Sequence, residues 1–404
     1  MENNETGVRI LTVKELVKIF KKDEEANNIE LLRFKEVGYE IIVGKGLYQE
    51  GDKIVYIMPD YCLSDLPIFK SFIEPEKGKS YLGNIDGKPR RVRAKKFNFH
   101  AGDGKSLYSN GIALPIEEVE EFIKIELVDL IIKLKADYNK INEYLTKELQ
   151  VFKYEKPETG SKVGQAAKGG FPKGVYKTDA TNINNVWGHI KFPIQLIGTE
   201  KVDGSSITIG VTDDYPDGFI ASRNINKSFF EKVFAGTRKK TLLEKIMFWK
   251  SPDLNVFKEV PSKDMFVVHG LPYLTRIKEI GYKNIIFRGE LNGKDAKGSG
   301  NKHNPAAKMP TNIQFFNADR MVNGIAVKMT NVEFEDMCDV HIFDSVETLF
   351  IQKFNSIEEI KEKCEKTFEY CKTERKELIE GIVLATPDNK LSFKYMNNEY
   401  DSKK

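Results

Sequence analysis

The chain has 404 residues and a formal net charge of +3, with 40% hydrophobic and 30% charged residues. A single core seldom grows past about 250 to 300 residues, so this length predicts two domains. No apolar run approaches the roughly 20 residues that span a bilayer, and the polar start Met1–Glu5 is unlike a signal peptide. We therefore expect no membrane segment and a cytoplasmic location.

The cysteines and histidines predict neither a disulfide framework nor a zinc site. The four cysteines form no C-x-x-C pair and have no metal-ligand spacing, and the five histidines are scattered. We expect reduced thiols at Cys62, Cys338, Cys364 and Cys371.

Short strands are expected in the N-terminal part. Residues Tyr39–Val43 and Lys53–Met58 are rich in strand formers, and glycines lie between them. This rhythm of short strands and glycine turns is typical of a small β-barrel. It is consistent with an OB-type domain.

A basic stretch interleaved with aromatic residues follows these strands. It comprises Lys88, Arg90, Arg91, Arg93, Lys95, Lys96 and Lys105, with Phe97, Phe99 and His100 among them. Such a mixture can combine phosphate neutralisation with stacking. A solvated strand with apolar partners facing the core explains the residues equally well, but their place in a small barrel favours nucleic-acid binding.

The domain boundary is expected after a helical region. Pro115–Gln150 has apolar residues at helix-like spacings with many charges between them. The Gly- and Lys-rich residues 160–174 then predict a flexible connector, a loop over the active site or a linker without a role. We therefore divide the chain into residues 1–155, a linker at 156–175, and a second domain at 176–404.

The motif Lys201-x-Asp203-Gly204 is the most informative part of the second domain. It joins two expected strands, Ile194–Val202 and Ser206–Val211. A free lysine is protonated near neutral pH and has no lone pair with which to attack phosphorus. A metal ion, neighbouring cations or burial lower the lysine pKa and activate it. Because strand positions i and i+2 point to one side, Asp203 is placed to hold such a metal beside Lys201.

Further segments follow this motif at characteristic spacings. A hairpin turn is expected at Asp213–Gly218, and helices at Lys227–Trp249 and Ser356–Glu380 are expected to pack on the catalytic sheet. The remaining segments are Ala221–Asn224, Phe287–Gly293, Ile313–Asp319, Glu380–Val383 and Leu391–Lys394.

With these segments in this order, the chain resembles the covalent nucleotidyltransferase superfamily of DNA ligases, RNA ligases and mRNA capping enzymes. Within it, the chain is most similar to the ATP-dependent RNA ligases that repair nicks in duplex RNA, because Tyr176–Asn185 resembles the lead-in segment of that branch. The resemblance implies an α+β fold: an antiparallel-sheet nucleotidyltransferase (adenylyltransferase) domain preceded by an OB-type barrel. It also implies RNA as partner, either a nicked duplex or a broken structured RNA, and we expect a monomer.

The resemblance assigns the nucleotide and metal chemistry to particular residues. Lys201 is the nucleophile that becomes lysyl-AMP after attack on ATP, and Lys394 neutralises the α-phosphate. Mg²⁺ or Mn²⁺ is the implied ion. Its expected ligands or water-holding carboxylates are Asp203, Glu290 and Glu380.

Three further positions are assigned to nucleotide binding. Glu200 is expected at the adenine edge, and Arg223 at the phosphates or the nucleic-acid end. Phe316 is the better of two candidates for packing on the purine, and one of the adjacent Phe315 and Phe316 is expected to be buried because neighbouring strand residues point to opposite sides. Glu290 is also a candidate for contact with the ribose.

Two positions depart from the family pattern, and three other functions stay open. Asn182 stands where relatives often carry arginine, and Met396 where many carry a second lysine, which leaves Lys394 alone or assisted by Lys390. A GTP-dependent capping guanylyltransferase uses the same lysine but usually places its OB domain after the catalytic domain. A DNA ligase is disfavoured by the lead-in segment and the domain order. An inactive RNA-binding relative is disfavoured by the intact lysines and carboxylates.

Overall fold

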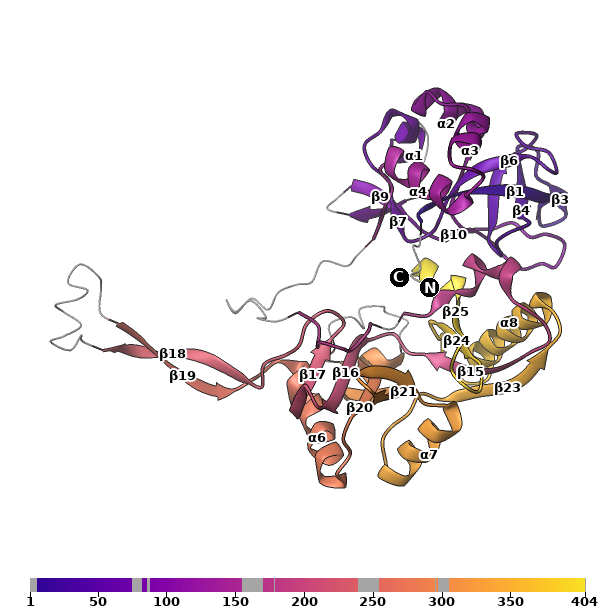
Figure 1. The fold of residues 1–404 in the computed structure, drawn as a ribbon. Coiled ribbons are helices and arrows are strands. Elements are labelled where there is room, and N and C mark those ends of the chain that lie inside the picture. Colours follow the sequence, from indigo (N-terminus) through magenta and orange to yellow (C-terminus); the bar gives the residue numbers. More distant parts are fainter. Residues whose placement is uncertain are drawn as a thin grey trace.

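The computed structural model describes residues 6–74, 82–85, 88–154, 170–177, 179–238, 254–294, 296 and 305–403. These residues form a mixed α/β fold that is rich in antiparallel sheets (Figure 1). The described residues between positions 6 and 153 lie largely above the rest in that view. Residues 156–169 of the expected linker lie outside the described part of the chain.

The N-terminal part is built on an antiparallel five-stranded sheet with the order β12-β6-β1-β4-β5. Its strands are β1 (Val8–Val17), β4 (Ile29–Phe34), β5 (Glu40–Gly44), β6 (Lys53–Ile57) and β12 (Ile112–Pro115). The two strands predicted from the sequence are confirmed as β5 and β6. The sheet edges approach each other, because the Asn110 amide before β12 donates to the Glu40 carbonyl at the start of β5.

Shorter strands surround this sheet, and helices pack on it. The strands are β2 (Phe20–Lys21), β3 (Glu24–Glu25), β7 (Tyr61–Cys62), β8 (Leu82–Ile85), β9 (Lys88–Val92), β10 (Lys95–Phe97), β11 (Leu107–Ser109) and β13 (Phe152–Lys153). The helices are η1 (Pro67–Phe69), α1 (Lys70–Ile73), α2 (Ile116–Ile123), α3 (Leu127–Lys133) and α4 (Tyr138–Glu148).

The predicted helical region Pro115–Gln150 is therefore confirmed, but as successive helices. α2 ends because Lys124 adopts a left-handed conformation with φ of 59°. α4 begins where the Asp137 side chain accepts hydrogen bonds from the first-turn amides of Asn139 and Lys140, a typical N-cap. The apolar residues of these helices join the hydrophobic cluster of the N-terminal sheet.

The C-terminal part contains two more five-stranded sheets. The first has the order β14-β25-β24-β15-β23, with β14 (Thr181–Asn182), β15 (Ile194–Lys201), β23 (Thr348–Phe354), β24 (Gly381–Ala385) and β25 (Ser392–Met396). The second has the order β17-β16-β20-β21-β22, with β16 (Ser205–Thr212), β17 (Tyr215–Ser222), β20 (Ile285–Asn292), β21 (Asn312–Val322) and β22 (Ile325–Lys328).

Each of these two sheets has its own hydrophobic cluster. Helix α8 (Ile357–Thr373) contributes to the cluster of the first sheet, and α6 (Met265–Ile280) and α7 (Asn331–His341) contribute to that of the second. The remaining helices are η2 (Ile183–Asn185), η3 (Trp187–His189), η4 (Pro305–Lys308) and α9 (Asn398–Lys403). The chain passes directly from β15 to β16, so the Lys201 motif joins the two sheets.

The predicted helix Lys227–Trp249 is wrong in its described part. Residues Phe230–Arg238 form β18, which pairs antiparallel with β19 (Leu254–Pro261) in a ribbon that projects from the body (Figure 1). Short apolar patterns do not separate helix from strand, and here pairing with a distant segment decides the conformation. Residues 239–249 lie outside the described part of the chain.

Two other predicted boundaries move. The hairpin turn is confined to Asp213 and Asp214, because Thr212 pairs with Tyr215 and extends β17. The predicted helix Ser356–Glu380 ends at Thr373, and Glu380 instead stands immediately before β24.

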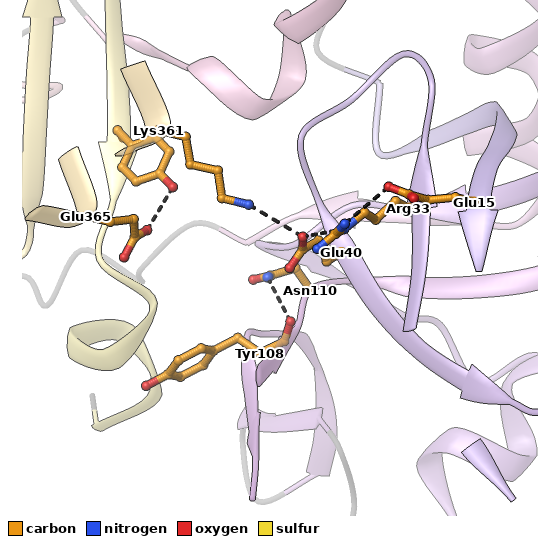
Figure 2. Close-up of polar contacts among 8 residues, drawn as sticks. Glu15, Arg33, Glu40, Tyr108, Asn110, Lys361 and Glu365 are labelled. Carbon is orange, nitrogen blue, oxygen red and sulfur yellow. Dashed lines mark hydrogen bonds and ion pairs between the residues drawn. The ribbon is translucent and has the colours of Figure 1, made fainter. Parts of the chain in front are cut away.

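The N-terminal and C-terminal parts contact each other through polar groups. Figure 2 shows Lys361 of α8 reaching Glu40 of β5, 3.4 Å away, while Arg33 pairs with the same carboxylate at 2.8 Å. The Gly38 amide also donates to the Asn184 carbonyl at 3.0 Å. In the described ranges, no helix is both long and apolar enough to cross a membrane.

Candidate active site

Lys201 is the last residue of β15, a strand that lies between β24 and β23. Its register partner on β24 is Gly381, so Lys201 lies next to Glu380. Its Nζ donates to Glu380 Oε2 at 2.5 Å. Gly381 has no room for a side chain, because an added Cβ would lie 2.6 Å from the Tyr395 carbonyl oxygen. Close strand packing therefore fixes the spacing of this lysine and carboxylate.

Glu290 reaches the same place from the second sheet. Ser206 of β16 pairs with Glu290 of β20, directly after the Lys201 motif. Gly204 allows the close approach of the two segments, since an added Cβ would lie 2.4 Å from the Leu291 carbonyl oxygen. The motif glycine is thus required by backbone packing against β20.

These charges perturb one another. Burial alone would lower the pKa of the Lys201 ammonium, but the carboxylates of Glu380, Glu290 and Asp203 outweigh it, and the pKa stands above its ordinary value. Burial, reinforced by the neighbouring carboxylates, raises the pKa of Glu290 to about 8. The site therefore holds more carboxylate than its own cations compensate, and Lys201 is protonated at neutral pH.

Asp203 is buried and bonded to the C-terminal helix. Its side chain accepts a hydrogen bond from the Tyr400 hydroxyl of α9 at 2.8 Å. Asp203 also lies near enough to Lys201 and Glu290 to shift their pKa values. Among the described residues, no three or more His, Cys, Asp and Glu side chains form a group that could hold a metal ion.

Arg223 and Lys394 meet at a residue that we did not single out from the sequence. The carboxylate of Asp179, in the lead-in segment, lies 3.2 Å from Arg223 and 2.9 Å from Lys394. Burial would raise the pKa of Asp179, but Lys394 and Arg223 outweigh it and lower the pKa. The charge of Arg223 also acts to lower the pKa of Glu290, so this cluster lies within electrostatic range of the Lys201 carboxylates.

The pairing of β14 with β25 explains the contact between Asp179 and Lys394. These strands run parallel, with Asn182 opposite Lys394, so the lead-in segment lies along the strand that carries the lysine. In the sequence, Asp179 is marked only by its place in the lead-in segment Tyr176–Asn185. The ion pairs of the Asp179 carboxylate with both Arg223 and Lys394 can be recognised only once the pairing of β14 with β25 is known.

Glu200 lies in a different ionic group from the lysine. Its carboxylate is 3.9 Å from Arg375, which also pairs with Glu347 and Glu377. Burial raises the pKa of Glu200, against the opposing effect of Arg375. Consecutive strand residues point to opposite sides, which accounts for the separation of Glu200 from Lys201.

The two phenylalanines of β21 differ in burial. Phe315 is fully buried and packs edge-on against Phe287 and Tyr273 of the second sheet's cluster. Phe316 is partly exposed. This difference agrees with the expectation that one of the two is buried, and it leaves Phe316 as the partly accessible one.

The two departures from the family pattern have local structural roles. The Asn182 side chain accepts a hydrogen bond from the Asn184 amide at 3.0 Å and caps η2. Met396 pairs with Gly381 across β24 and β25. Lys390, the other candidate for phosphate contact, pairs with Asp388 at 3.2 Å in the loop before β25.

Comparisons with known proteins identify the family of this chain. The model of the RNA ligase family matches residues 194–396, just over half of the chain. The search of curated proteins found no match.

Solved structures of Naegleria gruberi RNA ligase are similar to this chain along its length. A mutant with AMP and Mn is 18% identical with a TM-score of 0.66, a mutant with ATP and Mn is 18% identical with a TM-score of 0.64, and a complex with PPi is 19% identical with a TM-score of 0.63. Each match covers 98% of both chains. At these identities the likeness shows the fold, whereas the family match reaches the Lys201 motif and its carboxylates. The chain belongs to the RNA ligase family.

Proposed function

We propose that this chain is an ATP-dependent RNA ligase that joins a 3′-hydroxyl to a 5′-phosphate through a lysyl-AMP intermediate. One observation carries the proposal: Lys201 ends a strand in contact with Glu380 and within electrostatic range of Glu290, while Arg223 and Lys394 share the carboxylate of Asp179. A nucleophile, carboxylates and phosphate-binding cations are thus assembled at the junction of two sheets.

The first step uses Lys201 as the nucleophile. Its ammonium gives up a proton, with Glu380 placed to receive it, and Nζ then bonds to the α-phosphorus as the bond to pyrophosphate breaks. Lys394 and Arg223 neutralise the phosphate charge that develops. AMP next passes to the 5′-phosphate of RNA, and the 3′-hydroxyl displaces AMP to form the phosphodiester.

The donor set suits a hard divalent cation. Burial is the main cause that raises the pKa of Glu290 to about 8, and the neighbouring carboxylates of Glu380 and Asp203 raise it further, against the opposing charge of Lys201. Mg²⁺ usually keeps several waters and binds through one or two carboxylates plus substrate phosphates, so it needs no dedicated cage of protein ligands. Glu380, Glu290 and Asp203 would hold Mg²⁺ or Mn²⁺ or its waters. The bound ion would supply positive charge to the carboxylates and phosphates.

The nucleotide base is assigned to two further residues. Phe316 is partly exposed and would offer its ring for packing on the purine, and Glu200 would lie at the adenine edge. Stacking on an aromatic ring is favourable for any purine, so selection of adenine rests on polar contacts at the edge.

The N-terminal part is proposed as an OB-type RNA-binding domain. Support comes from its separate hydrophobic cluster and from the contact between the sheet edges at Asn110 and Glu40. We keep the division into residues 1–155, a linker at 156–175, and a nucleotidyltransferase domain at 176–404. Nicked or broken RNA would be recognised by shape, phosphates and 2′-hydroxyls.

The test is covalent labelling by ATP that carries the label on the α-phosphate, with Mg²⁺ or Mn²⁺, followed by denaturing electrophoresis. We expect label on the wild-type protein and none on Lys201→Ala, with transfer of the label to nicked RNA. Label from GTP alone would move the assignment to a capping guanylyltransferase. No label on protein pretreated with pyrophosphate would leave an inactive RNA-binding relative, and sealing of nicked DNA but not RNA would indicate a DNA ligase.

A further inference from the structure

We propose that Tyr400 of the C-terminal helix is a positioning residue that fixes the Asp203 carboxylate beside Lys201 and Glu290. The inference rests on the proposed function and deepens it, because it adds an element outside the family motifs to the adenylylation site. It also makes the N-terminal part a contributor to that site, through Arg93.

The contact between Tyr400 and Asp203 is buried. Tyr400 is 1% exposed and Asp203 is 8% exposed, and the hydroxyl donates to Asp203 Oδ2 at 2.8 Å. Asp203 stands in the short crossing between β15 and β16, which Gly204 holds against the Leu291 carbonyl. A hydrogen bond from a neutral hydroxyl orients a carboxylate and leaves its charge available. Tyr400 is therefore suited to aim Asp203 without neutralising it.

Asn397 ties the start of α9 to the strand segment that carries Glu380. Its amide donates to the Glu380 carbonyl at 2.9 Å, and its side-chain amide donates to the Ile379 carbonyl at 3.0 Å. Its side-chain oxygen accepts from the amides of Glu399 and Tyr400. The helix that carries Tyr400 is therefore anchored to the segment that contains Glu380, the hydrogen-bond partner of Lys201.

The other side of α9 is held by the N-terminal part. The guanidinium of Arg93, which follows β9, donates to the Asp401 carbonyl at 2.6 Å, one residue beyond Tyr400. This contact joins residues 308 apart in sequence. Arg93 belongs to the basic stretch that the sequence assigned to RNA, and here it binds protein backbone instead.

The test measures self-adenylylation without RNA, so RNA binding by the basic stretch does not enter. Tyr400→Phe removes one oxygen and keeps the ring. Hydrogen bonds to charged groups are worth enough that we expect labelling at saturating ATP to slow about tenfold or more. The metal concentration for half-maximal labelling should rise, while the ATP concentration for half-maximal labelling stays nearly unchanged.

Tyr395→Phe is the matched control. Tyr395 is also buried, and its hydroxyl donates to Glu365 at the same 2.8 Å, but it faces α8. We expect its labelling rate and metal dependence to match the wild type. Equal slowing in both variants would reduce the effect to packing and overturn the proposal, as would wild-type kinetics in a folded Tyr400→Phe protein.

A second variant covers the case in which Tyr400→Phe does not fold. Arg93 is partly exposed, and Arg93→Ala removes only its contact with α9. We expect this variant, like Tyr400→Phe, to raise the metal concentration for half-maximal labelling, by about two- to fivefold. An unchanged metal requirement in Arg93→Ala would then overturn the proposal. Absence of label on the wild-type protein would instead remove the proposed function itself, which distinguishes the two failures.

Discussion

The charge state of Lys201 sets the main chemical problem at the scale of single residues. In the protein alone, the ammonium is paired with Glu380 and its pKa is raised, which is the opposite of what nucleophilic attack requires. The same carboxylates that hold the proton are the groups that suit a divalent cation. Activation of the lysine is therefore expected to depend on the cation and nucleotide that bring compensating charge.

Asp179 raises a related question for the phosphate site. Its carboxylate forms ion pairs with Arg223 and Lys394, the two cations that are proposed to contact the nucleotide phosphates. Nucleotide phosphates must compete with this carboxylate for the same donors. Because exposed ion pairs are worth about 0.2 to 1 kcal/mol, the competition is modest.

We therefore predict that Asp179→Asn lowers the ATP concentration for half-maximal labelling by about two- to fivefold. Measurement of initial labelling rates over a range of ATP concentrations checks this. Glu362→Gln is the control, because Glu362 pairs with Lys366 within α8 and neither residue belongs to the candidate site. A higher ATP requirement in Asp179→Asn would show instead that the carboxylate positions the two cations for phosphate.

The sequence predicted the elements of the site better than the contacts between them. Strands β15 and β16 were expected from β-formers on each side of the Lys201 motif, and the structure has them within one or two residues. The helix expected at Lys227–Trp249 was wrong in its described part, because Phe230–Arg238 pairs as a strand with β19, a segment outside the one from which the helix was predicted. The contacts of Asp179 and Tyr400 could not be predicted, because each joins segments whose proximity depends on the tertiary fold.

The crossing between β15 and β16 is the element whose geometry matters most. We predict that Gly204→Ala reduces the free energy of unfolding by about 1 to 3 kcal/mol, because the added Cβ would meet the Leu291 carbonyl 2.4 Å away. Labelling should fall as well, since relief of the clash shifts Asp203 relative to Glu290. Denaturant unfolding and the labelling assay measure the two effects.

Gly170→Ala provides the comparison for this substitution. An added Cβ at Gly170 has no atom within 4 Å, so we expect unfolding and labelling close to the wild type. If Gly204→Ala kept both wild-type stability and wild-type labelling, the close approach of the motif to β20 would not require glycine at this position.

At the scale of the whole molecule, the N-terminal part presents only some of its basic residues to solvent. Arg90 and Arg91 pair with Asp65 and Asp60, whereas Lys95 and Lys96 are exposed on β10. Strand β10 also contacts α9, the helix that holds Asp203 through Tyr400. RNA that lies across β10 would therefore lie next to the adenylylation site.

We predict that replacing Lys95 and Lys96 with alanine weakens binding of nicked duplex RNA and reduces the slope of log affinity against log salt by roughly 1 to 2. Binding is measured on the Lys201→Ala background, where no turnover occurs, and labelling on the active background should stay unchanged. Alanine at Lys133 and Lys147, exposed on α3 and α4, removes the same charge from another surface and should leave the slope nearly intact. If both pairs reduced the slope equally, affinity would follow net charge and not the surface of β10.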